Sequence, residues 1–217
     1  LRPEGLYSDG ARILQILRGG PLYDYQRSAR IAGGGYVSSI RPKDFDIAAI
    51  DRASTHFLSG EIGLLLRLWA TEYYLDRDNL VQARVAFAQA EEVFKTSASD
   101  IRPSLHACLV VNAALTRRDA EATRIYWAAM QTKEAESPDT NYWQAKCAFH
   151  WAESRIILAR EAWKAGNDHL SALPNTGSNN YDRDCQARLL QIIEDDEGAH
   201  STEPAGQVHR QLRSVPG

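Results

Sequence analysis

Apolar residues recur at steps of three and four along most of this chain, which is the spacing of one face of an α-helix. From about Glu61 to Leu75 they lie on most sides of the predicted helix, which indicates that it is buried. From Leu80 to Phe94, after the polar break DRDN, they form a single stripe. These two segments predict an antiparallel helical hairpin whose first helix lies inside the fold.

The same arrangement recurs further along the chain. The segment from Ser104 to Thr116 is apolar, and the polar stretch RRD separates it from a second stripe. Triplets of a small, an aromatic and a small residue occur with the same spacing in both stripes, as Ala83, Phe87 and Ala90 and as Ala122, Tyr126 and Ala129. Small residues let neighbouring helices approach closely, so this pattern is typical of stacked helical hairpins.

The last third of the chain carries one long stripe and one shorter helical pattern. The stripe runs from Tyr142 to Trp163, and Gly166 is the expected C-cap of its helix. The stretch LPNTGSNN is expected to be a loop, and an amphipathic helix is expected from Tyr181 to about Glu194. The acidic run EDDE that follows is interpreted as a solvated helix end.

The region before Gly60 has shorter patterns. A helix is predicted from Leu22 to Ile31, and the glycines of AGGGYV end it. The stretch RPKDFD predicts an extended turn in which Asp44 or Asp46 caps the next helix.

We therefore predict an all-α fold of antiparallel helical hairpins with an N-terminal helical appendage. The appendage covers residues 1–58, the helical-repeat domain residues 59–197, and a mobile tail rich in Gly, Ser, Pro and charge residues 198–217. The hairpins resemble tetratricopeptide repeats, in which a tyrosine precedes the small-aromatic-small triplet by the interval that separates Tyr74 from Ala83.

Composition and charge disfavour two classes of function, nucleic-acid binding and membrane spanning. Of 217 residues, 44% are apolar and 24% charged, as in an ordinary globular protein, and the net charge of -3 disfavours nucleic acid as a partner. The longest apolar stretches are shorter than a membrane span requires. The chain has no initiating Met, so we expect it to be a fragment or a mature portion.

Cysteine and glycine patterns offer weaker candidates for a site. Three widely spaced cysteines are interpreted as small buried side chains rather than as a disulfide framework. Cys147 and His150 share a helical face as two possible metal ligands, but two ligands do not make a site, and we interpret them as core residues. The stretch AGGGYVSS lacks the GK[ST] ending of a phosphate-binding loop and is interpreted as a connector.

The stretch SDGARIL, followed by LRGGP and RPKDFD ahead of a helical-repeat region, resembles the C-terminal part of bacterial site-2-protease-like intramembrane zinc metallopeptidases. In that family two histidines of an HExxH helix and the aspartate of a DG motif bind zinc. The resemblance implies that Asp9 is a zinc ligand in the intact protein. This chain contains no HExxH, so it is expected to hold no cofactor and to have no catalytic activity on its own. Alternatively, Asp9 favours the start of a helix that Ser8 caps.

Two functions follow from these patterns. In the first, the chain is the C-terminal helical-repeat domain of a membrane-embedded zinc metalloprotease, on the cytoplasmic face of the membrane, and docks peptide or protein partners. Spans upstream of this chain would then provide the membrane attachment. In the second, the chain is a free-standing tetratricopeptide-like adaptor that binds a partner protein.

The substitution Asp9→Asn distinguishes the two roles of this residue. In the isolated chain it should lower the free energy of unfolding by only about 0.3–1 kcal/mol, and zinc titration should show no tight stoichiometric binding. In the intact membrane protein it should sharply lower both bound zinc and proteolysis, because one of three ligands is lost. Full zinc content and normal cleavage in that variant would contradict the metal role.

Overall fold

The computed structural model describes residues 13, 18–97, 101–131 and 139–201. These residues form nine α-helices and a single turn of 3-10 helix, with no β-strand among them, which confirms the all-α prediction. The elements are α2 (Pro21–Gly34), η1 (Pro42–Asp44), α3 (Ile47–Ser54), α4 (Gly60–Asp76), α5 (Leu80–Ser97), α6 (Pro103–Arg117), α7 (Ala120–Gln131), α8 (Thr140–Ala152), α9 (Ile156–Ser171) and α10 (Gly177–Ser201).

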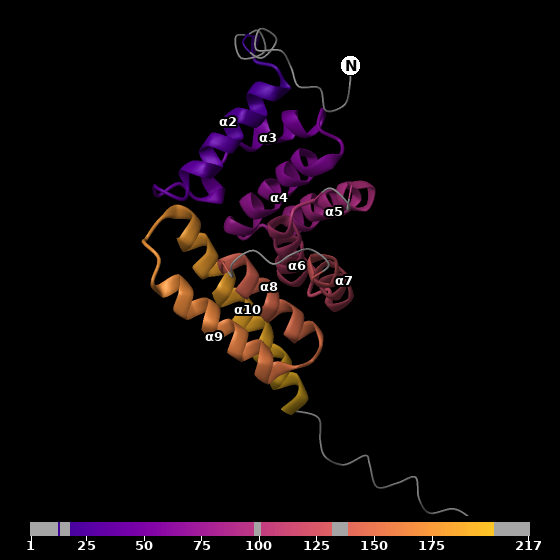
Figure 1. Cartoon of the computed structure of the whole chain (residues 1–217), viewed down its shortest axis with the longest axis vertical. Helices are drawn as coiled ribbons and strands as arrows, with labels where there is room; N and C mark the ends of the chain where they lie inside the picture. Colours follow the sequence, from indigo (N-terminus) through magenta and orange to yellow (C-terminus); the bar gives the residue numbers. More distant parts are fainter. Residues whose placement is uncertain (1–12, 14–17, 98–100, 132–138, 202–217) are drawn as a thin grey trace, which may run out of the picture.

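Consecutive helices pack as hairpins, α4 with α5, α6 with α7, and α8 with α9. The hairpins follow one another along the long axis of the molecule, with α2 and α3 at one end and α8 to α10 at the other (Figure 1). As predicted, α4 is an inner helix, since Leu64, Leu66 and Leu68 are each at most 1% exposed. The first triplet also lies at a close helix contact, because Ala83 and Phe87 are fully buried.

The prediction of one continuous helix over the third stripe is wrong. The helix breaks at residues 153–155, where Ser154 adopts a left-handed conformation with φ of 56°. The Arg155 amide then donates to the His150 carbonyl at 2.9 Å, which closes the end of α8 and reverses the chain into α9. Without a glycine at this position, the sequence carried no local sign of the break.

Gly166 lies inside α9 and is not its C-cap. A Cβ at this position would come within 2.9 Å of the Gln186 side-chain nitrogen and 3.1 Å of the Trp143 Cβ. The glycine therefore permits close packing between α9 and its neighbours, and the helix continues to Ser171.

The N-terminal part shares a core with the hairpins. Asp46 caps α3 by accepting a hydrogen bond from the Ala49 amide at 3.1 Å, so of the two predicted caps the structure selects this one. Ile50 and Ala53 of α3 are fully buried against Leu66 of α4. The described part of the appendage is thus packed onto the first hairpin.

The acidic run near the end of α10 was expected to be a solvated end, and it instead links several helices. Asp195 pairs with Arg118 at the end of α6, and Glu197 pairs with Arg160 of α9. Asp196 accepts a hydrogen bond from the Trp151 indole nitrogen at 2.7 Å. The helix α10 continues to Ser201, past residue 197, where the repeat region is predicted to end.

The start of α10 packs against the N-terminal part of the chain through backbone hydrogen bonds. The Gly177 amide donates to the Ser38 carbonyl at 2.6 Å, and the Ser178 amide donates to the Gly35 carbonyl at 3.0 Å. Nearby, the Arg41 guanidinium pairs with Asp76 of α4 and, at 2.5 Å, with Asp184 of α10. The predicted loop LPNTGSNN therefore holds the first turn of α10, docked against residues 35–41.

We predict that Gly177→Ala destabilises the fold. A Cβ at Gly177 would overlap the Ile40 backbone carbonyl, so the two segments must separate, at a cost of about 1–3 kcal/mol. Gly198→Ala in the same helix is the control, because its Cβ would meet no atom within 4 Å. Urea unfolding measures both variants, and equal stability of Gly177→Ala and the parent chain would contradict the close approach.

Candidate functional site

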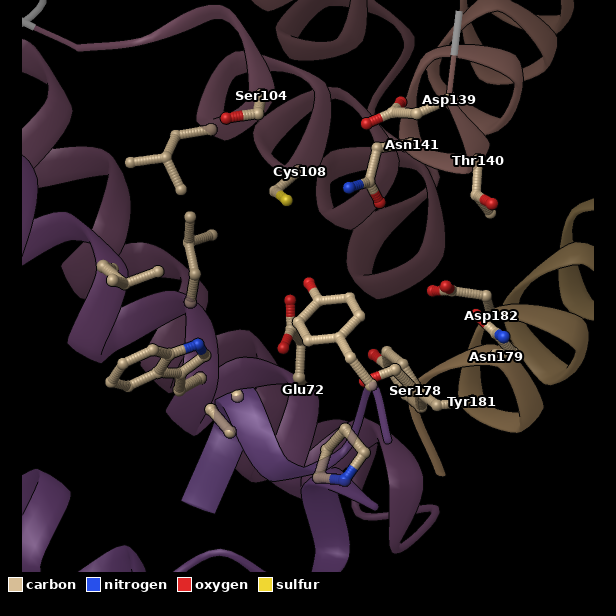
Figure 2. Close-up of a pocket in the computed structure, with 18 of the residues that line it drawn as sticks. Glu72, Ser104, Cys108, Asp139, Thr140, Asn141, Ser178, Asn179, Tyr181 and Asp182 are labelled. Carbon is tan, nitrogen blue, oxygen red and sulfur yellow. The ribbon is translucent and has the colours of Figure 1, made fainter. Parts of the chain in front are cut away.

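A cavity of about 660 Å³ lies where the N-terminal part meets the hairpins. Its wall is built from α2, η1, α4, α6, α8, α10 and the end of α9. Figure 2 shows polar side chains from four of these helices facing one hollow. They are Glu72 of α4, Ser104 and Cys108 of α6, Thr140 and Asn141 of α8 with its cap Asp139, and Ser178, Asn179, Tyr181 and Asp182 of α10.

Glu72 is the acidic side chain that α4 contributes to the cavity. It is half-buried, and its carboxylate points into the hollow (Figure 2). Within the described residues the carboxylate makes no hydrogen bond and no ion pair. Burial, with a smaller contribution from the negative charge of Asp182, raises the pKa of Glu72 from 4.5 to about 8.

Asp182 faces the same hollow from α10 (Figure 2). Its backbone carbonyl accepts a hydrogen bond from the Gln144 side chain at 2.8 Å, but its carboxylate has no partner among the residues that the structure describes. Burial and the nearby Asp139 raise the pKa of Asp182 from 3.8 to about 7, although the Arg183 cation acts in the opposite direction.

Asp139 and Thr140 form the edge of the cavity at the start of α8. The Asp139 carboxylate caps the helix by accepting a hydrogen bond from the Tyr142 amide at 2.9 Å. Thr140 is only 7% exposed, and its hydroxyl makes no hydrogen bond within the described part of the chain. This hydroxyl can therefore hydrogen-bond to a ligand at the edge of the cavity.

The two arginines near the cavity make their hydrogen bonds and ion pairs with residues other than Glu72 and Asp182. Arg102 lines the wall but pairs with Glu61 at 2.6 Å. The Arg183 guanidinium donates to the side chains of Asn175 and Asn180 and to the carbonyls of Leu170 and Leu173. His169 is the other basic residue of the wall. The carboxylates of Glu72 and Asp182 therefore face the cavity without a cationic partner.

The remaining wall is apolar or neutral. Leu65, Leu68 and Trp69 of α4 line one side. Burial, with negative charges nearby, raises the pKa of the Cys108 thiol well above its usual value, so the group is a neutral thiol and a poor nucleophile. The cavity thus combines an apolar side with polar side chains from several helices.

The predicted metal ligand lies elsewhere in the chain. Asp9 is outside the described residues, so its role stays a prediction. Within residues 18–97, 101–131 and 139–201, no three His, Cys, Asp or Glu side chains lie together as a metal site would require.

Cys147 and His150 belong to the packing of α8. Cys147 is fully buried, as expected of a core residue, and all three cysteines are free. His150 is half-buried, and its Nδ1 has no hydrogen-bond partner in the described part of the chain.

Sequence reasoning missed Glu72 and Asp182. The available signal for Glu72 was its place inside an apolar helix, in the stretch WATEYYL, where a charged residue is unusual. Asp182 gave no comparable signal, because an acidic residue early in an amphipathic helix is ordinary.

No family profile, curated protein or solved structure matches this chain. None of the helices described here is both long and apolar enough to cross a membrane.

We predict that Glu72 makes the stability of the fold depend on pH. Its pKa is about 8 in the folded chain against an ordinary 4.5, so between these values the unfolded state binds fewer protons and stability falls as pH rises. Glu72→Gln should therefore raise the free energy of unfolding at pH 9 by at least ~1 kcal/mol and change it little at pH 4.

Urea unfolding at pH 4, 7 and 9 measures this effect. Glu194→Gln is the control, because Glu194 is exposed on α10. A gain from Glu72→Gln that is equal at all three pH values would contradict the burial of an ionisable carboxyl.

Proposed function

We propose that this chain is a binding module that receives a group of a peptide or protein partner in the cavity between its N-terminal helices and its hairpins. The observation that carries the proposal is the cavity itself, which is large, lined by several helices, and holds polar groups without partners among the described residues. Its volume of about 660 Å³ lies within the usual range of ligand sites.

The architecture supports binding in a second way. Stacked helical hairpins commonly present extended surfaces to a partner, and a cavity that opens onto such a surface can anchor one side chain of a bound segment. Arg41, the N-cap of η1, pairs with Asp76 of α4 and Asp184 of α10 and so joins three parts of the wall. A preformed cavity lowers the entropic cost of binding.

Binding fits this wall better than catalysis does. Carboxyl groups with raised pKa values in a cleft are candidates for acid-base chemistry, but such groups also occur without it. Cys108 supplies a thiol to the wall, but this neutral thiol makes no hydrogen bond to a base within the described residues. We therefore propose no reaction for this chain alone.

The module could belong to a larger membrane protein or stand alone. The resemblance to zinc metallopeptidases, with Asp9 as a zinc ligand and a place at the cytoplasmic face of the membrane, depends on SDGARIL, which lies largely outside the described residues. It remains a prediction. The binding module is compatible with that setting and equally with a free-standing adaptor.

Blocking the cavity tests the proposal. Gly33 lines the cavity in α2, and a Cβ there would meet no atom within 4 Å, so Gly33→Trp should fill the space without distorting the helix. Peptides selected on the parent chain from a displayed random library should bind Gly33→Trp at least tenfold more weakly and bind Gly33→Ala normally. Nuclear magnetic resonance shifts caused by these peptides should centre on the cavity wall.

Two results would overturn the proposal. One is a library that yields no peptide bound above background. The other is selected peptides that bind Gly33→Trp normally and shift resonances away from the wall, for instance on the exposed face of α5 around Val81 and Val85.

A further inference from the structure

We propose that the group recognised by the cavity is a primary alkylammonium, such as a lysine side chain, held between the carboxylates of Glu72 and Asp182. This inference rests on the proposed function, because it assigns a ligand chemistry to the same cavity. It is carried by the two carboxylates that face the cavity without a cationic partner, by the Thr140 hydroxyl, which lines the cavity and makes no hydrogen bond among the described residues, and by the apolar side of the cavity.

No basic side chain of the described residues forms an ion pair with the carboxylates of Glu72 and Asp182. The N-terminal end of α8 favours a negative charge, but Asp139 already supplies one as its cap. Glu72 lies near the C-terminal half of α4, where the helix dipole gives it no support, and Asp182 lies beyond the first turn of α10. A cation in the hollow would offset the desolvation of both groups.

An ammonium group fits this wall better than a metal ion. Divalent metals require several close oxygen or nitrogen ligands, and the described residues include no group of three suitable side chains. An ammonium has three donors, which can be shared among acceptors on different helices. The hydroxyl of Thr140, a residue that is only 7% exposed, makes no hydrogen bond in the described chain and provides one acceptor in addition to the carboxylates.

The apolar side of the cavity suits the stem of the same ligand. Leu65, Leu68 and Trp69 line it, and the aliphatic chain of a lysine readily covers apolar surface while its charged end reaches acceptors. A short alkyl chain ending in an ammonium therefore matches both parts of the wall.

Binding should be coupled to proton release. The pKa values of Glu72 and Asp182 are about 8 and about 7, so both carboxyls hold protons for part of the time near neutral pH. A bound cation favours the deprotonated forms, so affinity should increase as pH rises from 6 to 9. The lysine ammonium itself remains charged over this range.

Other titratable groups face the same hollow. They are Tyr36, Arg102, Cys108, Asp139, His169 and Tyr181. The pKa values of Cys108 and Tyr181 are raised well above their usual range by burial, so both groups stay neutral, and Arg102 is paired with Glu61. His169 is the group to control for, and His169→Gln should leave the increase of affinity with pH in place.

The experiment uses capped tripeptides that differ only in the central residue. Titration calorimetry with the whole chain at pH 6, 7.5 and 9 compares lysine with norleucine, arginine and glutamate, and 1,5-diaminopentane tests a free amine. The lysine peptide should bind at least tenfold more tightly than the norleucine peptide at pH 9, and heats in buffers of different ionisation enthalpy should show proton release.

The variants Glu72→Gln and Asp182→Asn should each weaken lysine binding at pH 9 by about tenfold or more, as expected for loss of a charge-assisted hydrogen bond. Glu194→Gln is the matched control on an exposed carboxylate. Circular dichroism confirms that each variant is folded, and the buffer-dependent heats of the parent chain test the same proposal without any variant.

The outcomes separate the two proposals. Equal binding of lysine and norleucine peptides that Gly33→Trp abolishes would overturn the ammonium and keep the cavity as the binding site. Preference for arginine or glutamate, or lysine binding unchanged by Glu72→Gln and Asp182→Asn, would overturn it as well. Tight binding of 1,5-diaminopentane but not of the lysine peptide would support the ammonium and assign it to a free amine, which would overturn the peptide as partner. Failure of every probe, together with failure of the peptide library, would overturn both.

Discussion

The backbone contact between Gly177 and residues 38–40 is the constraint on which the cavity depends. It brings the start of α10 against the segment that follows α2, and only a glycine leaves room for the Ile40 carbonyl there. Arg41 reinforces the same junction by pairing with Asp76, whose side chain is 2% exposed, and with Asp184. Because these segments lie far apart in the sequence, their junction encloses a space that no single hairpin contains.

The junction brings two carboxyl groups into one cavity, where burial raises their pKa values. Glu72 comes from the first hairpin and Asp182 from the last helix, and their closeness contributes to the raised pKa of Glu72. The nearby arginines are engaged with other partners, Arg102 with Glu61, and Arg183 with the carbonyls of Leu170 and Leu173 and the side chains of Asn175 and Asn180. The protein therefore tolerates two poorly compensated acidic groups in one cavity, and this cost to stability is reasonable where a ligand supplies the missing charge.

The acidic end of α10 shows the opposite arrangement. Asp195 and Glu197 have arginine partners on other helices, and their pKa values are lowered mainly by those hydrogen bonds. Asp195 and Glu197 thus hold the end of α10 to other helices, as Asp184 holds its start to Arg41, whereas Asp182 faces the cavity.

Much of the fold could be predicted from the sequence by itself, because helical periodicity is local. The spacing of apolar residues located α4 to α7 and their pairing, and Asp46 was one of two predicted caps for α3. The break between α8 and α9 was missed, since Ser154 in a left-handed conformation leaves no mark on the apolar stripe. The cavity was decided only by the tertiary structure. Nothing in the local sequence places Glu72 and Asp182 in one cavity, because their burial depends on neighbours from distant segments that the Gly177 junction brings together.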